Sequence, residues 1–244
     1  MIASLDLARF PLGVAEREAL AARRAGRRSD ALFARLLLGM RLRSMPVPVP
    51  QMTIAYFFAL WRDEPALERF RAGPLRRWDG AREHLALTLH PVQSFGAWGG
   101  ADPLGGERTK PRPGPVALIT HSRVRPGKAA RFFVADGPVV RALEHAEGRL
   151  WSDGFVDDLA RLDSGTLSLW RDTAAATAFA YGPGVHQTAV KAQRDGGWFS
   201  ESWFARFAIE AASGSWKGVE AADLLVAAPS PMTPTNAGPP LAGR

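Results

Sequence analysis

The sequence predicts an α+β protein in which two ferredoxin-like βαββαβ repeats pack their sheets face to face as one α/β barrel. Two observations lead to this prediction. An internal repeat runs through the 244-residue chain, and a segment rich in proline and glycine separates its two copies. The length suits one large domain or two small ones of roughly 100–150 residues each. The alternative is therefore a pair of independent ferredoxin-like domains.

The repeat is clearest around two tryptophans. LWRDEPALERFRAGP at positions 60–74 aligns with LWRDTAAATAFAYGP at positions 169–183, an offset of 109 residues (170 − 61 = 109). Further along, GAWGG at 96–100 aligns with GSWKG at 214–218. Positions kept in both copies are expected to be structural. Four tryptophans are therefore predicted to lie in the core or at the barrel rim: Trp61, Trp98, Trp170 and Trp216.

Hydrophobic periodicity and helix caps predict the elements of each copy. The first copy is expected to have strands at 2–10, 36–43, 53–61 and 85–95 and helices at 14–28 and 63–72, the second helix capped by Asp63. The second copy is expected to have strands at 116–124, 150–155, 166–170 and 203–211, with helices from Pro126 to Glu147, after Asp172 and after Gly184. The chain thus divides into a first repeat (1–100), a linker (101–115), a second repeat (116–221) and a proline-rich flexible tail (222–244).

Composition excludes several classes of protein. The chain contains no cysteine, so it has no disulfide, no zinc–thiolate site, no cysteine nucleophile and no thiolate-bound haem or iron–sulfur cluster. The N-terminal MIASLDLARF lacks the basic and apolar regions of a secretion signal, and Arg35 interrupts the most apolar stretch, ALFARLLLGM. We therefore expect no transmembrane helix and a cytoplasmic location.

The net charge of +7 is concentrated early in the chain, where residues 1–50 hold nine arginines against four acidic residues. The helix at 14–28 should therefore present a basic face, either to solvent or to anionic lipid headgroups. No nucleic-acid-binding motif accompanies it, so no nucleic-acid partner is expected. The chain also lacks the glycine-rich nucleotide loops, the zinc-protease helix and the nucleophile elbow. His84 and His90 are interpreted as surface residues rather than metal ligands.

A polar residue present in one copy of the repeat alone is a candidate for function. His186 stands where the first copy has Arg77, and it shares its predicted helical face with Ala189, Val190 and Gln193. A buried imidazole needs a partner, because an unsatisfied buried polar group costs roughly 1–3 kcal/mol. A haem iron is one such partner. The other possible partner is a main-chain carbonyl, in which case His186 is an ordinary core or cap histidine.

Arg206 is the second candidate, since the first copy has Thr88 at this position. Strand alternation places Arg206 on the same face as Phe204, where its side chain either extends to solvent or faces a ligand cavity. His121 and Arg123 share a strand face and could also line such a cavity. Three acidic residues are interpreted as surface or cap residues: Asp153, Asp195 and Glu201.

Several blocks, in order along residues 1–218, resemble the spheroidene monooxygenases of carotenoid biosynthesis and their relatives. They are Leu7-Ala-Arg9-Phe10, Trp61-Arg-Asp63, Gly96-Ala-Trp98-Gly-Gly100, Gly114-Pro-Val-Ala-Leu-Ile-Thr120 with Arg125-Pro126, Leu169-Trp-Arg-Asp172, and Gly182-Pro-Gly-Val-His186 through Gly197-Trp198-Phe199, Glu201 and Ala205-Arg-Phe207. That family is similar in fold to the dimeric α/β-barrel superfamily, in agreement with the duplication.

The resemblance implies a haem-dependent monooxygenase that introduces a keto group at C2 of an acyclic carotenoid, using haem b iron, O2 and an external electron donor such as a ferredoxin-like protein. It implies that His186 is the axial iron ligand and that Arg206 is a catalytic residue on the distal side or a partner of a haem propionate. Trp198 would lie beside the cofactor, and His121 is a second candidate ligand. Two successive hydroxylations of one carbon, followed by loss of water, would give the ketone.

The resemblance does not fix the substrate. Related barrels use haem for aldoxime dehydration, nitrogen–oxygen chemistry and peroxidase reactions, so a haem enzyme acting on a small soluble metabolite is one alternative. A non-catalytic haem or carotenoid carrier and a cofactor-free barrel monooxygenase are two others. Because a long polyene dissolves in membranes, we expect an apolar substrate and peripheral contact between the basic helix and a membrane surface.

Overall fold

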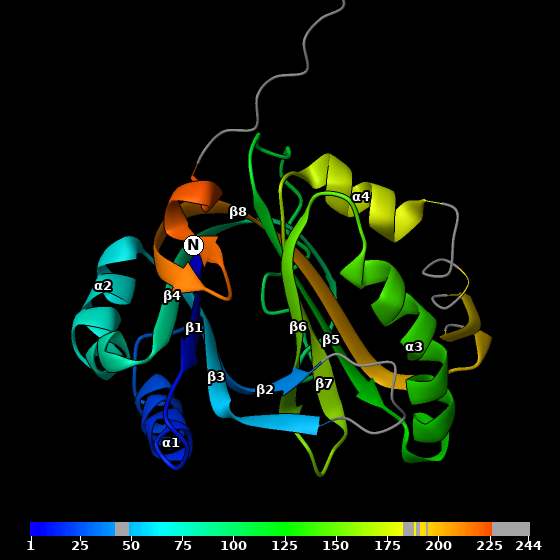
Figure 1. Ribbon diagram of the computed structural model, residues 1–244, viewed down its shortest axis with the longest axis horizontal. Helices are drawn as coiled ribbons and strands as arrows, with labels where there is room; N and C mark the ends of the chain where they lie inside the picture. Colours follow the sequence, from blue (N-terminus) through cyan, green and yellow to red (C-terminus); the bar gives the residue numbers. More distant parts are fainter. Residues whose placement is uncertain (42–48, 183–187, 189–190, 194, 226–244) are drawn as a thin grey trace, which may run out of the picture.

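The structure, a computed structural model, describes residues 1–41, 49–182, 188, 191–193 and 195–225. Its long strands form a closed antiparallel barrel, with helices α1 and α2 on one side and α3 and α4 on the other (Figure 1). The strand order is β4-β1-β3-β2-β6-β7-β5-β8, and β8 pairs with β4 to close the ring. The predicted single barrel is thus confirmed, because pairing of β2 with β6 and of β4 with β8 joins the two copies.

Each copy of the repeat supplies four barrel strands. The first contains β1 (Ile2–Arg9), α1 (Ala15–Gly26), β2 (Phe33–Arg41), β3 (Val49–Trp61), α2 (Glu64–Ala72), the short 3-10 helix η1 (Arg76–Gly80) and β4 (Glu83–Gly96). The second contains β5 (Val116–Val124), the 3-10 helix η2 (Pro126–Lys128), α3 (Ala129–Glu144), β6 (Arg149–Asp158), β7 (Asp163–Trp170), α4 (Thr173–Tyr181) and β8 (Phe199–Trp216). A two-residue strand, β9 (Val219–Glu220), and η3 (Ala221–Leu224) follow, and Leu224 is buried.

The predicted helix caps are confirmed. A carboxylate oxygen of Asp63 accepts a hydrogen bond from the main-chain N–H of Ala66 at 3.0 Å, and Asp172 accepts one from Ala175 at 2.7 Å. Each aspartate satisfies one of the main-chain donors that a helix start leaves unpaired. The helix predicted from Pro126 is different, because residues 126–128 form a 3-10 turn and α3 begins at Ala129.

The barrel interior is filled with side chains. Alternate residues of the strands point inward and form one continuous core, which includes Tyr56, Phe58, Phe155, Trp203 and Phe207. An eight-stranded barrel is narrow enough for side chains to fill. The centre of the barrel is therefore a hydrophobic core, and ligands must bind at its ends or on its outer faces.

A tryptophan lies near each end of this interior, as the repeat predicts. Trp98 follows Gly96, whose φ of +93° suits glycine and at which a Cβ atom would collide with the carbonyl oxygen of Ser202. Trp216 follows Gly214, whose φ is +82° and whose Cβ would collide with the carbonyl oxygen of His84. Both tryptophans are fully buried, so the shared Gly-x-Trp pattern reflects the close approach of β4 and β8.

Residues 101–115 connect the two copies and are fastened to the barrel. The Asp102 carboxylate accepts hydrogen bonds from Ser94 Oγ at 2.8 Å and from the Trp203 indole at 2.8 Å, and Leu104 is buried. None of the helices in the described ranges is long and apolar enough to cross a lipid bilayer.

Candidate functional site

Arg206 lies on the outer face of β8, beneath the helices of the second repeat. Its register partners are Gln93 on β4 and Leu118 on β5. Phe204, two residues earlier, packs with the small apolar cluster of that outer face, whereas Ala205 and Phe207 belong to the barrel interior. The predicted strand alternation is therefore confirmed.

The Arg206 side chain is a buried cation without a counter-charge in the described part of the chain. It is 6 % exposed, and its Nε atom has no hydrogen-bond partner among these residues. Burial lowers the pKa of Arg206, but a guanidinium stays protonated in proteins. A buried charge is stable only when it is paired or bound by a ligand. Arg206 therefore does not extend to solvent, and it is suited to bind an anionic group.

The equivalent place in the first repeat is neutralised. There Thr88 replaces Arg206, and Arg71 of α2 reaches the same outer face. Its guanidinium donates to Thr88 Oγ1 at 3.0 Å and to the Leu87 carbonyl at 2.9 Å, and its Nε lies 3.2 Å from Asp6 Oδ1. Because Asp6 is fully buried, this arginine–aspartate pair forms a closed structural unit.

A second uncompensated charge lies on α3. Asp136 is one turn before the buried Val140, so its carboxyl faces the sheet. Burial raises the pKa of Asp136 to about 6, and no opposite charge in the described ranges counters this effect. Close by along the helix, the Phe132 ring contacts Phe199 of β8 with 5.5 Å between ring centroids. The space between α3 and the sheet thus combines aromatic side chains with a carboxyl that titrates near neutral pH.

Two other predicted site residues belong to the segment that leads into β8. His186 lies outside the described residues. Trp198 is buried; its main-chain N–H donates to the Gln193 carbonyl at 3.2 Å, and its carbonyl accepts from the Arg125 N–H at 2.9 Å. Trp198 is therefore fixed at the start of β8, the strand that carries Arg206.

His121 points to the opposite side of the sheet, into one end of the barrel interior. It pairs in register with Trp203, and its ring stacks on Trp98 with 4.7 Å between centroids and 10° between planes. Burial lowers the pKa of His121 to about 4, so the imidazole is neutral at pH 7. The structure thus separates His121 from Arg206 by the thickness of the sheet and does not bring them to one ligand.

Sequence reasoning missed two carboxylates that lie close to His121, Asp157 and Asp163. Asp163 Oδ1 lies 3.8 Å from His121 Nε2, and the Trp98 indole donates to Asp157 at 2.9 Å. The offset of the repeat could have pointed to Asp163, because the first copy has the apolar Ile54 there (163 − 54 = 109). Asp157 lies next to an irregularity in β6 that no periodicity predicts.

Asp153 corrects another expectation, because it is neither a surface residue nor a cap. It is 4 % exposed inside the opposite end of the barrel. Its Oδ2 accepts hydrogen bonds from Gln51 at 3.0 Å, the Tyr56 hydroxyl at 3.1 Å and the Lys217 ammonium at 2.6 Å. These partners satisfy the carboxylate. Glu201 is likewise neither a surface residue nor a helix cap: from β8 it accepts hydrogen bonds from the main-chain N–H groups of Gly99 and Gly100 and pairs with Arg123 at 3.3 Å.

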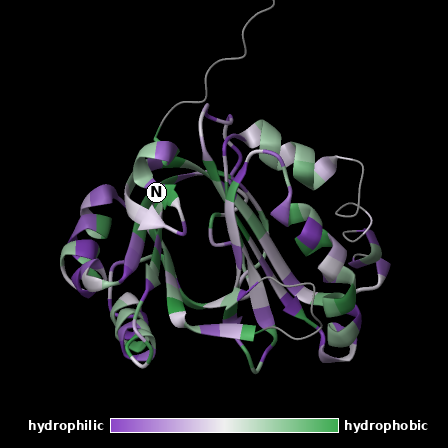
Figure 2. Cartoon of the chain, viewed as in Figure 1, coloured by the Kyte–Doolittle hydropathy of each residue, from purple (hydrophilic) through white to green (hydrophobic). Residues whose placement is uncertain are grey.

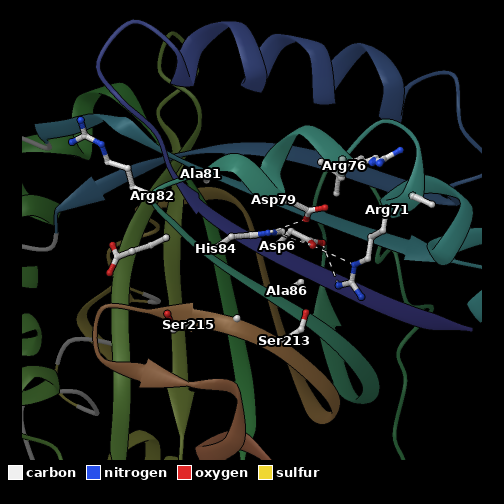
Figure 3. A pocket seen from close by; sticks show the side chains of 14 residues that line it. Asp6, Arg71, Arg76, Asp79, Ala81, Arg82, His84, Ala86, Ser213 and Ser215 are labelled. Carbon is white, nitrogen blue, oxygen red and sulfur yellow. Dashed lines mark hydrogen bonds and ion pairs between the residues drawn. The ribbon is translucent and has the colours of Figure 1, made fainter.

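An open pocket of about 670 Å³ lies on the outside of the first repeat. Figure 3 shows His84 between Asp6 and Asp79, with Arg71 directed at Asp6. His84 is half-buried rather than a plain surface residue, 3.6 Å from Asp6 and 3.7 Å from Asp79. Opposite charges thus face one another within this pocket, which distinguishes it from the surroundings of Arg206.

Comparison with known proteins identifies relatives of the chain. It is 36% identical over 172 residues to the spheroidene monooxygenase of Rubrivivax gelatinosus, covering 69% of this chain and 65% of that protein. It is 33% identical over 146 residues to the enzyme of Rhodobacter capsulatus, covering 59% of this chain and 60% of that protein. It is 31% identical over 190 residues to the enzyme of Cereibacter sphaeroides, covering 75% of this chain and 58% of that protein. The chain thus spans about 60% of the length of these curated relatives.

Solved structures agree with the fold. An aldoxime dehydratase in complex with butyraldoxime superposes with a TM-score of 0.53 at 10% identity, covering 91% of this chain and 80% of that one. A second aldoxime dehydratase gives 0.52 at 11% identity, with coverage of 85% and 81%. No family model matches the chain. The resemblance expected from the motifs is nevertheless confirmed by the curated relatives, and the chain is a relative of the spheroidene monooxygenases built on a duplicated, dimeric α/β-barrel fold.

Proposed function

We propose that this chain is a haem-dependent monooxygenase that introduces a keto group at C2 of an acyclic carotenoid or a similar apolar substrate. The observation that carries the proposal is Arg206, a buried arginine without a counter-charge in the described chain, on an apolar outer face. The first repeat closes the equivalent place with its own ion pair. The similarity to spheroidene monooxygenases supports the reaction class.

The chemistry of Arg206 and of the aromatic side chains beside it suits a haem group. Arg206 would bind an anionic part of it, such as a propionate, or oppose negative charge that develops on bound oxygen. His186, in the segment that leads into β8, offers the neutral imidazole that suits a haem iron. When bound, the haem would supply the activation of O2 with electrons from an external donor, which we expect to be a ferredoxin-like protein.

The chain itself would orient the substrate and exclude water. Phe132, Phe199 and Phe204 offer aromatic surface along α3 and β8, which suits a polyene better than a polar metabolite. Asp136, with its pKa raised to about 6, is the titratable group of this face and can hold or release a proton near neutral pH. Arg206 would keep its charge throughout the reaction.

An absorption spectrum tests the proposal. Wild type, His186→Ala and the control His145→Ala would be produced with ample haem; His145 is an exposed residue that bonds the Arg141 carbonyl. We expect a Soret band in wild type and control and its loss in His186→Ala. Carotenoid oxygenation at C2, assayed with O2 and a reductant, should fall at least tenfold in Arg206→Met. A Soret band that survives in His186→Ala would contradict its role as ligand, and no band in any protein would contradict the haem.

We also propose that α1 contacts an anionic membrane surface from which the substrate is drawn. Exposed arginines on and after this helix accompany exposed leucines: Leu20 is 41 % exposed, Leu12 80 % and Leu32 53 %. The arginines are Arg17, Arg23, Arg24, Arg27 and Arg28. Basic and apolar side chains on one surface are typical of helices that lie in a membrane interface.

Co-sedimentation with vesicles tests this contact. Vesicles containing phosphatidylglycerol should bind the wild type, and binding should fall at least tenfold when Arg24, Arg27 and Arg28 are changed to Glu. A control with the same charge change at the exposed Arg62, Arg76 and Arg82 should bind like the wild type. Equal loss in both variants would show a general charge effect and overturn the assignment to α1.

A further inference from the structure

We propose that the barrel end occupied by Trp98 holds a divalent transition-metal ion, bound by His121, Asp157 and Asp163. This site lies on the inner side of the sheet, whereas Arg206 lies on the outer side. It is therefore separate from the oxygenation site proposed above and does not depend on it.

The three side chains have the spacing of a metal-binding triad. One ligand atom from each can be chosen so that all three lie within 4.8 Å of one another. His121 is fully buried, and neither of its ring nitrogens has a hydrogen-bond partner among the residues that the structure describes. A buried imidazole without hydrogen-bond partners lowers the stability of the fold. A metal ion between Nε2 and the two carboxylates would satisfy it.

Local structure aims these side chains at one point. Stacking on Trp98 fixes the plane of the His121 ring. Asp157 and Asp163 lie on the two strands of the β6–β7 hairpin, and the register shifts between Val156 and Asp158. Such a bulge turns a side chain out of the regular alternation, and bulges are common beside functional sites.

The duplication provides an internal control for this cluster. Its structural surroundings occur in both copies, because Arg9 pairs with Glu83 as Arg123 pairs with Glu201. The triad occurs only in the second copy. By strand register and repeat offset, Leu7, Gly39 and Ile54 take the places of His121, Asp157 and Asp163. The fold thus forms the equivalent end of the barrel, around Trp216, without a polar triad at these three positions.

The arginines around the triad neutralise its carboxylates, but at Asp157 they contact only Oδ2 among the described residues. Arg123 donates to both oxygens of Asp163, at 2.6 and 2.9 Å, and Arg35 lies 3.3 Å from Asp157 Oδ2. Arg161 lies 4.0 Å from Asp163 Oδ2, so with Glu201 three carboxylates face three guanidinium groups. The Trp98 bond and the Arg35 contact both use Oδ2 of Asp157, which leaves Oδ1 for a metal. One nitrogen and two carboxylate ligands suit Mn²⁺, Fe²⁺, Co²⁺ or Zn²⁺.

Titration with Mn²⁺ alone tests the proposal, with the free ion followed by electron paramagnetic resonance so that bound haem does not interfere. Wild type treated with chelator should bind one equivalent and gain thermal stability. His121→Leu, which introduces the residue of the first repeat, and Asp157→Asn, which keeps an acceptor for Trp98, should each weaken binding at least tenfold. The exposed Asp79→Asn is the matched control and should bind like the wild type.

Two results would overturn the site. One is no saturable Mn²⁺ binding by wild type. The other is unchanged binding in Asp157→Asn, a variant that decides the question even if His121→Leu fails to fold. Loss of binding in the control as well would point to nonspecific attraction by surface carboxylates. The readout is the metal ion itself. A negative result therefore does not affect the proposed haem site, and absence of haem binding does not affect the proposed metal site.

Discussion

The outer faces of the two repeats differ more than their shared topology implies. In the first repeat, buried residues of α1, α2 and η1 pack with β1 and β3 in one large cluster that contains Phe57, Trp61, Phe70 and Trp78. In the second, the buried cluster among the described residues is small: Val116, Leu118, Leu143, Trp170 and Ala176. The helices differ as well: Figure 2 shows that α2 of the first repeat is largely hydrophilic, whereas α4 of the second repeat is mostly hydrophobic.

Buried charge follows the same division. The first repeat pairs Arg71 with Asp6 beneath α2. The second buries Arg206 on β8 and half-buries Asp136 on α3, and among the described residues neither has an opposite charge beside it. A buried ion without a partner is costly, so it is kept where a ligand supplies what the chain does not. One copy of the duplicated fold thus pairs its outer-face arginine within the chain, whereas the other leaves its arginine without a counter-charge among the described residues, as the proposed ligand site requires.

The largest effect is expected when the buried ion pair between Arg71 and Asp6 of the first repeat is removed. Arg71→Met leaves Asp6 fully buried without its cation, and breaking a buried pair costs about 3–5 kcal/mol. Urea denaturation should show this loss in the free energy of unfolding. The double variant Asp6→Asn, Arg71→Met should recover most of it. A single variant that costs under about 1 kcal/mol would show that the pair is not structural.

The next prediction concerns what both repeats share. Gly96→Ala and Gly214→Ala each place a Cβ against a carbonyl oxygen at positive φ, so each should cost about 2–4 kcal/mol. Gly100→Ala is the control, because its φ is +94° but its Cβ would meet open space; it should cost less. Thermal unfolding of the three variants provides the measurement. Equal losses at all three positions would mean that backbone conformation alone matters, not the approach of β4 and β8.

A pH effect distinguishes the second repeat. The folded-state pKa of Asp136 is about 6, above the unfolded value of 3.8, so the folded state binds its proton more tightly. The stability from this group is fully present below pH 3.8 and is lost as the pH rises through 6. Relative to Asp136→Asn, the wild type should lose about 2 kcal/mol between pH 4 and pH 7. The exposed Asp79→Asn serves as control, and a wild-type curve parallel to that of Asp136→Asn would refute the raised pKa of the half-buried Asp136 carboxyl.

The smallest expected change in stability is also the most informative. Arg206→Met removes a buried cation without a counter-charge in the described chain, so the free energy of unfolding should change by less than about 1 kcal/mol or rise. Activity should nevertheless be lost. Arg71→Met, in contrast, should lower the free energy of unfolding. Parallel denaturation and turnover assays would show this contrast. A loss of more than about 2 kcal/mol would mean that Arg206 is structural like Arg71.

The order and type of the repeated elements could be predicted from the sequence, because periodicity, helix caps and a constant offset are local signals. Asp63 and Asp172 show this directly, since each caps the helix predicted to follow it. Strand alternation likewise placed Arg206 and Phe204 on one face. The same reasoning treated Asp153 as a surface or cap residue, because its partners Tyr56 and Lys217 are far away in the sequence.

The sequence alone therefore determined the duplication, the barrel class, the structural tryptophans and the candidacy of Arg206, all of which depend on spacing along the chain. Only the tertiary structure decided which charges are neutralised and which residues meet. Arg71 finds Asp6 while Arg206 finds no counter-charge among the described residues, and His121 joins Asp157 and Asp163 inside the barrel. Burial and charge pairing arise from contacts between strands distant in sequence, so no local pattern encodes them.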